Sequence, residues 1–207
     1  MNFFQAIILG IVQALTEYLP VSSSAHIRII GDLMLGADPG AAFTAIIQIG
    51  TELAVILYFR RDIINILSHW FGCLFGKNGP DWRARMGRGD KYATLGWNVI
   101  VGSIPIIILG FTLQNIIETS LRNLWITVTV LFLFGLLLWI VDARSRQIKT
   151  MDDMNYRDAF LFGLGQSMAL IPGVSRSGGT ITVGRALGYT RESAVRLSFL
   201  MAIPAVF

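Results

Sequence analysis

Apolar residues occur along this chain in long runs that are interrupted at only a few places. Three of the runs approach the roughly 20 residues that a helix needs to cross a bilayer. A fourth begins near Ala194 and continues to Phe207. The three complete runs are Ala41–Phe59, Thr94–Leu113 and Leu124–Val141. This pattern predicts an all-α polytopic membrane protein.

Two shorter apolar runs end in a different way. Phe3–Leu19 and Ala159–Ile171 each stop at a proline followed by serines, and a second short run, Ile27–Leu35 or Ile181–Leu187, follows the break. A short helix, a polar break and another short helix are typical of a re-entrant hairpin, because irregular backbone at membrane depth survives only where it is buried or lines a wet cavity. Matching interruptions in two halves of a chain predict a site near the bilayer midplane.

The two interrupted regions also match residue by residue. Identical residues recur 153 positions further along the chain for Ala6, Gly10, Gln13, Val21, Ser22 and Ser24. We interpret this register as a duplication within a single transmembrane domain, 1–207, with repeat one at about 1–142 and repeat two at about 155–207. Because Phe207 falls on Ala54 in this register, the second repeat is expected to be truncated at the C-terminus.

Composition and charge agree with a membrane protein. The 207 residues are 54% hydrophobic and 14% charged, whereas soluble domains carry about a quarter charged residues. Basic residues cluster in Arg60–Lys91 and Arg144–Arg157, which we interpret as cytoplasmic loops by the positive-inside rule. The first hairpin then enters from outside and the second from inside, so the repeats are inverted and their tips can meet.

Other features exclude alternatives or add little. The net charge of +4 does not indicate nucleic-acid binding, because no basic face or aromatic platform accompanies it. Cys73 is the single cysteine, which excludes an intrachain disulfide. His69 and Asp142 are expected to lie at the membrane interface.

The first break carries several groups suited to chemistry. Glu17 lies one turn after Gln13, and an ionisable group inside an apolar segment is costly enough to indicate function. Pro20 ends the helix, and Ser22, Ser23 and Ser24 stand where the next helix would begin. His26 follows, so a hydroxyl nucleophile beside a carboxylate and an imidazole is one interpretation; helix capping by the serines and a structural histidine are the other.

The second break supplies a cation. Pro172–Thr180 contains Ser175, Arg176 and Ser177 within a glycine-containing loop, and Arg176 presents a planar fork of donors suited to phosphate. A structural pair between Arg176 and Glu17 is the alternative. Weaker candidates are Gln48 and Glu52, which share a helix face and are expected to line the cavity.

At these residues the chain resembles the bacterial undecaprenyl-diphosphate phosphatase family, also called bacitracin-resistance proteins. One signature is Gln13 to Glu17 running into Pro20-Val21-Ser22-Ser23, closed by His26. The other is Pro-Gly-x-Ser-Arg-Ser-x-x-Thr, from Pro172 to Thr180. The resemblance extends along the whole chain, and it implies a multi-pass protein of the bacterial plasma membrane with an inverted repeat and two re-entrant hairpins.

The resemblance also implies an activity and residue roles. The expected reaction removes the terminal phosphate of undecaprenyl pyrophosphate, which renews the cell-wall lipid carrier and confers bacitracin resistance, with Mg²⁺ or Ca²⁺. Ser23 would be the nucleophile or would position a water, Arg176 the phosphate clamp, and Glu17 with His26 the acid–base or metal groups. Metal ligands would be Gln13 and Glu17. The substrate would also contact Ser22, Ser24, Ser175, Ser177 and Thr180.

Other interpretations stay open at this point. A transporter or flippase of polyprenyl phosphate also fits, since inverted repeats with broken helices are transporter architecture. The type 2 phosphatidic acid phosphatase pattern is echoed only by Ser24-Ala25-His26 and Ser175-Arg176. The expected partners are a polyprenyl pyrophosphate lipid and the bilayer, and a homodimer is an open possibility.

Overall fold

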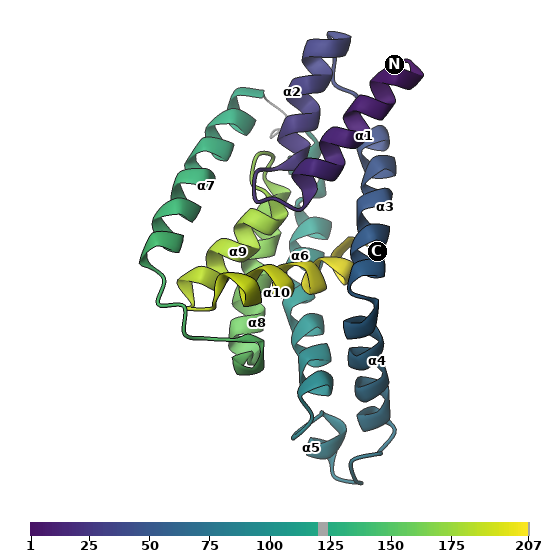
Figure 1. The fold of residues 1–207 in the computed structure, drawn as a ribbon, viewed down its shortest axis with the longest axis vertical. Helices are drawn as coiled ribbons and strands as arrows, with labels where there is room; N and C mark the ends of the chain where they lie inside the picture. Colours follow the sequence, from purple (N-terminus) through teal and green to yellow (C-terminus); the bar gives the residue numbers. More distant parts are fainter. Residues whose placement is uncertain (120–123, 207) are drawn as a thin grey trace.

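A computed structural model describes residues 1–119 and 124–206, and this part of the chain is largely helical (Figure 1). The first helices are α1 (Phe3–Glu17), α2 (Ser23–Leu35), α3 (Ala41–Tyr58), α4 (Arg60–Leu74), α5 (Trp82–Arg85), α6 (Lys91–Thr119) and α7 (Leu124–Arg144). The later ones are η1 (Met151–Asp153), α8 (Tyr156–Ser167), η2 (Met168–Leu170), α9 (Arg176–Ala186) and α10 (Arg191–Val206). No strand occurs among the described residues, so the all-α prediction is confirmed.

Two helices are long and apolar enough to cross a membrane. They are Lys91–Leu113, within α6, and Leu124–Arg144, which is α7, and they contain the runs predicted at Thr94–Leu113 and Leu124–Val141. Much of the apolar surface of α7 is open, with Phe132 70% and Trp139 69% exposed. Lipid is a solvent in which such a surface is stable, so the helices fit a membrane protein.

The remaining predicted run, Ala41–Phe59, forms only part of a candidate membrane span. α3 and α4 pass the length and composition test only together, as a pair bent by 71° at a short break. α4 also lies in the Arg60–Lys91 stretch, which we expected to be a loop, so that expectation was wrong for residues 60–74. The helix forms because its apolar side chains, such as Ile66 and Trp70, pack against Gly96 of α6.

Each of the two interrupted regions forms a pair of packed helices joined by a Ser-rich turn. α1 packs on α2 and α8 packs on α9. The new helices begin at Ser23 and Arg176, directly after the predicted breaks. In Figure 1 the α1–α2 turn and the α8–α9 turn approach each other from opposite ends of the molecule. Ser177 Oγ donates a hydrogen bond to the carbonyl of Leu19 at 3.2 Å, so the two turns are in contact.

The position of the α8–α9 pair is fixed by a close helix crossing. A Cβ on Gly163 of α8 would lie 2.1 Å from the carbonyl oxygen of Gly102 on α6. Only glycine allows backbones to approach this closely. Phe162, Leu197 and Met201 are fully buried beside this crossing and join α8 to α10. α10 lies across the other helices of this core rather than along them (Figure 1).

An ion cluster centred on Asp142, with a buried Arg185 and an exposed Arg191, fixes the far end of α9. Arg185 is fully buried, and its Nε donates to Asp142 Oδ1 at 2.5 Å. Arg191, which begins α10, donates to the same carboxylate at 2.6 Å. Asp142 lies near the end of α7, where the sequence predicted an interfacial residue, and it joins three helices.

Candidate active site

An ion pair across the contact between the two turns forms the centre of the candidate site. Arg176, the first residue of α9, donates from Nη2 to Glu17 Oε1 at 2.8 Å. The same nitrogen donates to Glu52 Oε1 of α3. One guanidinium therefore lies between two carboxylates that are 9% and 1% exposed. The structural pair between Arg176 and Glu17, which the sequence left as an alternative, is present.

Glu17 also gathers polar groups of the first turn. Its Oε2 accepts a hydrogen bond from Ser23 Oγ at 2.5 Å and one from Gln13 Nε2 at 2.9 Å. Gln13 lies one helical turn before Glu17, as the sequence predicted. Ser23 thus presents its hydroxyl to a carboxylate that can accept its proton, which is the arrangement of a nucleophile and its base.

The serines on either side form two short contacts. Ser22 Oγ lies 3.2 Å from Ser24 Oγ, and Ser175 Oγ lies 3.0 Å from Ser177 Oγ. Ser175 also caps α9 by accepting from the N–H of Gly178 at 3.1 Å. Ser22 has φ of 62°, an uncommon value for a residue other than glycine. Such backbone strain is concentrated at functional sites in proteins.

A cavity of about 510 Å³ lies at this contact. The predicted site residues that line it are Gln13, Glu17, Ser22, Ser23, Ser24, Ser175, Arg176 and Ser177. Two predicted residues lie outside the lining. The Nδ1 atom of His26 contacts the carbonyl of Ser22 at 2.9 Å, and Thr180 Oγ1 donates to the carbonyl of Arg176 at 2.7 Å. Both therefore support the backbone of residues that line the cavity.

Three buried polar atoms of this network have no hydrogen-bond partner among the described residues. They are Gln13 Oε1, Glu52 Oε2 and Arg176 Nη1. A buried group without a partner is unfavourable, so each such atom requires an explanation. Gln13 and Arg176 line the cavity and Glu52 does not, so the free oxygen of Gln13 and the free nitrogen of Arg176 are the atoms that suit a ligand carrying both a cation and an anion.

Two oxygen-bearing groups of the cavity lining, Glu17 and Gln13, suit an oxygen-preferring divalent cation. No group of three or more His, Cys, Asp or Glu placed to hold a metal occurs in the described part of the chain. Glu17 and the unpaired Gln13 oxygen nevertheless supply the carboxylate and carbonyl oxygens that Mg²⁺ and Ca²⁺ prefer. Mg²⁺ in particular completes its shell with water and substrate phosphates rather than with a full set of protein ligands.

Glu52 is the residue whose contact the sequence did not predict. Gln48 lines the cavity as expected, whereas Glu52 lies behind Arg176 and is 1% exposed. In the sequence, Glu52 is a carboxylate inside an apolar segment, which indicates a functional residue. That signal marked the residue but gave no indication of its partner, which is 124 residues away in the sequence.

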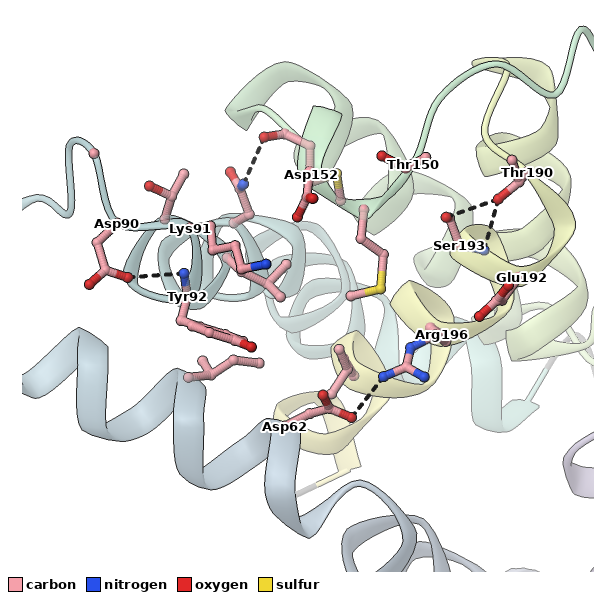
Figure 2. Close-up of a pocket in the computed structure, with 18 residues that line it drawn as sticks. Asp62, Asp90, Lys91, Tyr92, Thr150, Asp152, Thr190, Glu192, Ser193 and Arg196 are labelled. Carbon is pink, nitrogen blue, oxygen red and sulfur yellow. Dashed lines mark hydrogen bonds and ion pairs between the residues drawn. The ribbon is translucent and has the colours of Figure 1, made fainter.

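A larger cavity of about 790 Å³ lies elsewhere, between α4, η1 and the first turns of α6 and α10 (Figure 2). It shares none of its described lining residues with the first cavity. Figure 2 shows Asp62 and Arg196 pointing toward each other, and they form an ion pair at 2.9 Å. The charged lining residues are Asp62, Asp90, Asp152 and Glu192 against Lys91 and Arg196. Most of the predicted site residues line the smaller cavity and none of them lines the larger one, so the smaller cavity is the candidate active site.

Comparisons with known proteins agree along the chain. Residues 6–207 match the family described as "Bacitracin resistance protein BacA". A protein of Bifidobacterium longum subsp. infantis named "Undecaprenyl-diphosphatase" is 90% identical over the whole chain, which covers 70% of that protein. Proteins of the same name from Bifidobacterium adolescentis and Paenarthrobacter aurescens are 73% and 55% identical, and the chain covers 70% and 72% of them.

Proposed function

The chain belongs to the bacitracin resistance protein BacA family, and we propose that it hydrolyses undecaprenyl diphosphate to undecaprenyl phosphate and inorganic phosphate. It is an undecaprenyl-diphosphatase that recycles the cell-wall lipid carrier and confers bacitracin resistance. The observation that carries this proposal for the site is the contact of Arg176 with Glu17 across two Ser-rich turns. Phosphoryl transfer is catalysed by a cation that stabilises charge on the phosphate and by a base that activates or positions the nucleophile. A guanidinium beside a hydroxyl–carboxylate pair provides both kinds of group.

Arg176 is proposed to bind the terminal phosphate. Its Nη1 is buried, has no partner among the described residues and belongs to a side chain that lines the cavity. Arginine donates two parallel hydrogen bonds to phosphate oxygens and keeps its charge at every accessible pH. The unpaired nitrogen therefore supports a role in holding the negative charge that grows on the transferring group.

Ser23 and Glu17 are proposed to act on the nucleophile. Ser23 either attacks the terminal phosphorus or positions a water that attacks it, and Glu17 accepts the proton through its 2.5 Å contact with Ser23 Oγ. The bond between that phosphorus and the bridging oxygen breaks, and undecaprenyl phosphate leaves. If water attacks, inorganic phosphate forms directly; if Ser23 attacks, a water then hydrolyses the resulting phosphoserine and releases inorganic phosphate, which restores the Ser23 hydroxyl. His26 is proposed to support this turn, because its ring contacts the carbonyl of Ser22.

Further ligands of the substrate are proposed from the lining of the cavity. Ser22, Ser24, Ser175 and Ser177 present hydroxyls near the phosphate position, while Thr180 supports Arg176 through its carbonyl. Gln13 and Glu17 would hold Mg²⁺ or Ca²⁺, which when bound neutralises charge on phosphoryl oxygens. The unpaired Gln13 oxygen supports this assignment.

We also propose that the α1–α2 and α8–α9 pairs are re-entrant hairpins of an inverted repeat, 1–142 and 155–207, in a multi-pass protein of the plasma membrane. The opposite approach of the two turns supports the proposal (Figure 1), as does the exact register of Gln13 with Gln166. The polyprenyl tail would stay in lipid while the headgroup enters between the tips. A homodimer remains a prediction, to be checked by the mass of the purified protein in detergent.

Phosphate release from undecaprenyl diphosphate by purified protein in detergent tests the function. Without a membrane gradient, a phosphatase releases phosphate and a transporter does not. We expect release that stops with EDTA and resumes with Mg²⁺ or Ca²⁺. Release that is unaffected by EDTA would contradict the proposed cation, and no release at all would favour the transporter of polyprenyl phosphate.

A further inference from the structure

The site contains a second carboxylate that neither Ser-rich turn provides. Glu52 belongs to α3, and its Oε1 accepts a hydrogen bond from Arg176 Nη2. The side chain is 1% exposed and is not among the residues that line the cavity. A buried carboxylate is costly unless it is paired, so its contact with Arg176 is what makes its burial tolerable.

The two carboxylates contact the same nitrogen of Arg176. Glu17 and Glu52 both accept from Nη2, and Nη1 is left with no partner among the described residues. A guanidinium is planar and rigid, so holding Nη2 from two sides also fixes the direction of Nη1. The contacts therefore fix the direction of Nη1, the amino group of Arg176 that is left without a partner among the described residues.

The two carboxylates differ in what else they can do. Glu17 lines the cavity and also accepts from Ser23 and Gln13. Glu52 lies behind Arg176, and Arg176 is the one hydrogen-bond partner that the structure gives its carboxylate among the described residues. One guanidinium between two carboxylates leaves a net charge of −1, which opposes pyrophosphate binding, so the second carboxylate needs a role that offsets this cost.

We propose that Glu52 is a positioning residue that anchors Arg176 throughout the reaction. Glu17 is thereby free to leave the guanidinium and take the proton from Ser23. The inference rests on the proposed function and assigns separate roles to the two acids of the site. Glu52 itself does not touch the substrate.

A binding experiment tests the anchor without any turnover. The probe is methylenediphosphonate, a pyrophosphate analogue that cannot be hydrolysed, titrated by calorimetry into purified protein in detergent with Mg²⁺. Glu52→Leu removes the acceptor, and we expect the Kd of this variant for the analogue to be about tenfold higher or more. The free energy of one charge-assisted hydrogen bond corresponds to about that change in Kd. Glu52→Gln keeps an acceptor oxygen, and we expect a Kd within about threefold of the unaltered protein.

A control variant on the same helix isolates the effect. Thr51 is buried beside Glu52, and its hydroxyl donates to the carbonyl of Gln48 within α3. Thr51→Val should bind the analogue as the unaltered protein does. If Glu52→Leu is folded and binds the analogue equally well, the anchoring role is wrong.

Kinetics of Glu52→Gln test the division of roles, also in the case that the leucine variant does not fold. Without the second charge, Arg176 holds Glu17 more tightly, so Glu17 is less available to accept the proton of Ser23. We expect kcat to fall at least about fivefold while KM stays within about threefold, because the proton transfer is impaired and substrate binding is not.

Other kinetic results overturn the inference. An unchanged kcat would do so, and so would a smaller folded fraction whose kcat per folded molecule and KM equal those of the unaltered protein, because that result indicates a structural role alone. If the unaltered protein releases no phosphate, the proposed function fails, while the calorimetric comparison still decides whether Glu52 positions Arg176.

Discussion

Ser23 is the residue whose hydroxyl is closest to a base. Its Oγ contacts Glu17 Oε2 at 2.5 Å, and both side chains line the cavity. The sequence predicted the serine run and the carboxylate, and it left open whether these serines only cap a helix. The contact supports the chemical interpretation, because a capping serine would instead point to backbone N–H groups.

Removal of this hydroxyl is therefore predicted to affect catalysis more than binding. Ser23→Ala should lower kcat about a hundredfold or more with a small change in KM, since a group that acts in the transition state is lost. Thr16→Val is the control, because the Thr16 hydroxyl bonds to the carbonyl of Val12 in its own helix. Steady-state phosphate release checks this, and a Ser23→Ala rate near that of Thr16→Val would exclude Ser23 from the reaction.

Asp90 is a titrating residue outside the membrane spans. Burial opposes its ionisation, but hydrogen bonds from the His69 ring and from the N–H groups of Ala93 and Tyr92 outweigh this and lower the pKa of Asp90. A carboxyl with a lowered pKa in the folded state stabilises the fold above its unfolded pKa of about 3.9. That contribution is lost as the pH falls through the folded-state pKa.

The matching prediction concerns Asp90→Asn. At pH 7 this variant should be less stable by about 1 kcal/mol or less, because the pair with His69 is partly exposed. The difference should disappear as the pH falls below about 4. Thermal unfolding in detergent across this pH range measures it. A stability difference that grows on acidification would show that the lowered pKa does not stabilise the fold.

At the scale of elements, the apolar runs predicted the helices well where the environment is uniform. α6 and α7 agree with their predicted runs because every turn of such a helix faces lipid or packed protein. α4 was missed because its charged residues, such as Arg60 and Asp62, resemble a polar loop, and its apolar stripe has meaning only against α6. The 71° bend between α3 and α4 has no proline or glycine at the break to predict it.

The repeat register yields a test of helix packing. Gly10 and Gly163 occupy matching positions, yet a Cβ at Gly10 would meet nothing within 4 Å, whereas one at Gly163 would collide with Gly102. Gly163→Ala should cost about 1–3 kcal/mol, the usual range for overpacking. Gly10→Ala should be neutral or stabilising by up to about 1 kcal/mol, since alanine favours helix.

Thermal unfolding of the two variants in the same detergent compares these glycines directly. An equal effect of both substitutions would contradict the close α6–α8 crossing. Because this crossing positions the α8–α9 turn, Gly163→Ala should also lower phosphate release, whereas Gly10→Ala should leave it unchanged.

At the scale of the whole molecule, the candidate site exists only through long-range contacts. Arg176 meets Glu17 from 159 residues away and Glu52 from 124 residues away. The sequence offered the first contact as an alternative, because an arginine in an apolar segment needs an anionic partner and the tips of the two interrupted regions were expected to meet. It could not predict the second, since a lone carboxylate in an apolar helix can face any of several neighbours. The Nδ1 atom of His26 contacts the Ser22 carbonyl, and the predicted part of His26 in the reaction stays a prediction.

The proposed reaction depends on Arg176, which joins the two turns, and variants of this residue test that dependence. Phosphate release from undecaprenyl diphosphate is compared between the unaltered protein and Arg176→Ala and Arg176→Lys, in detergent with Mg²⁺. We predict a loss of about a hundredfold or more for alanine, and little rescue by lysine, which lacks the planar fork. Near-normal release by folded Arg176→Ala would contradict the account.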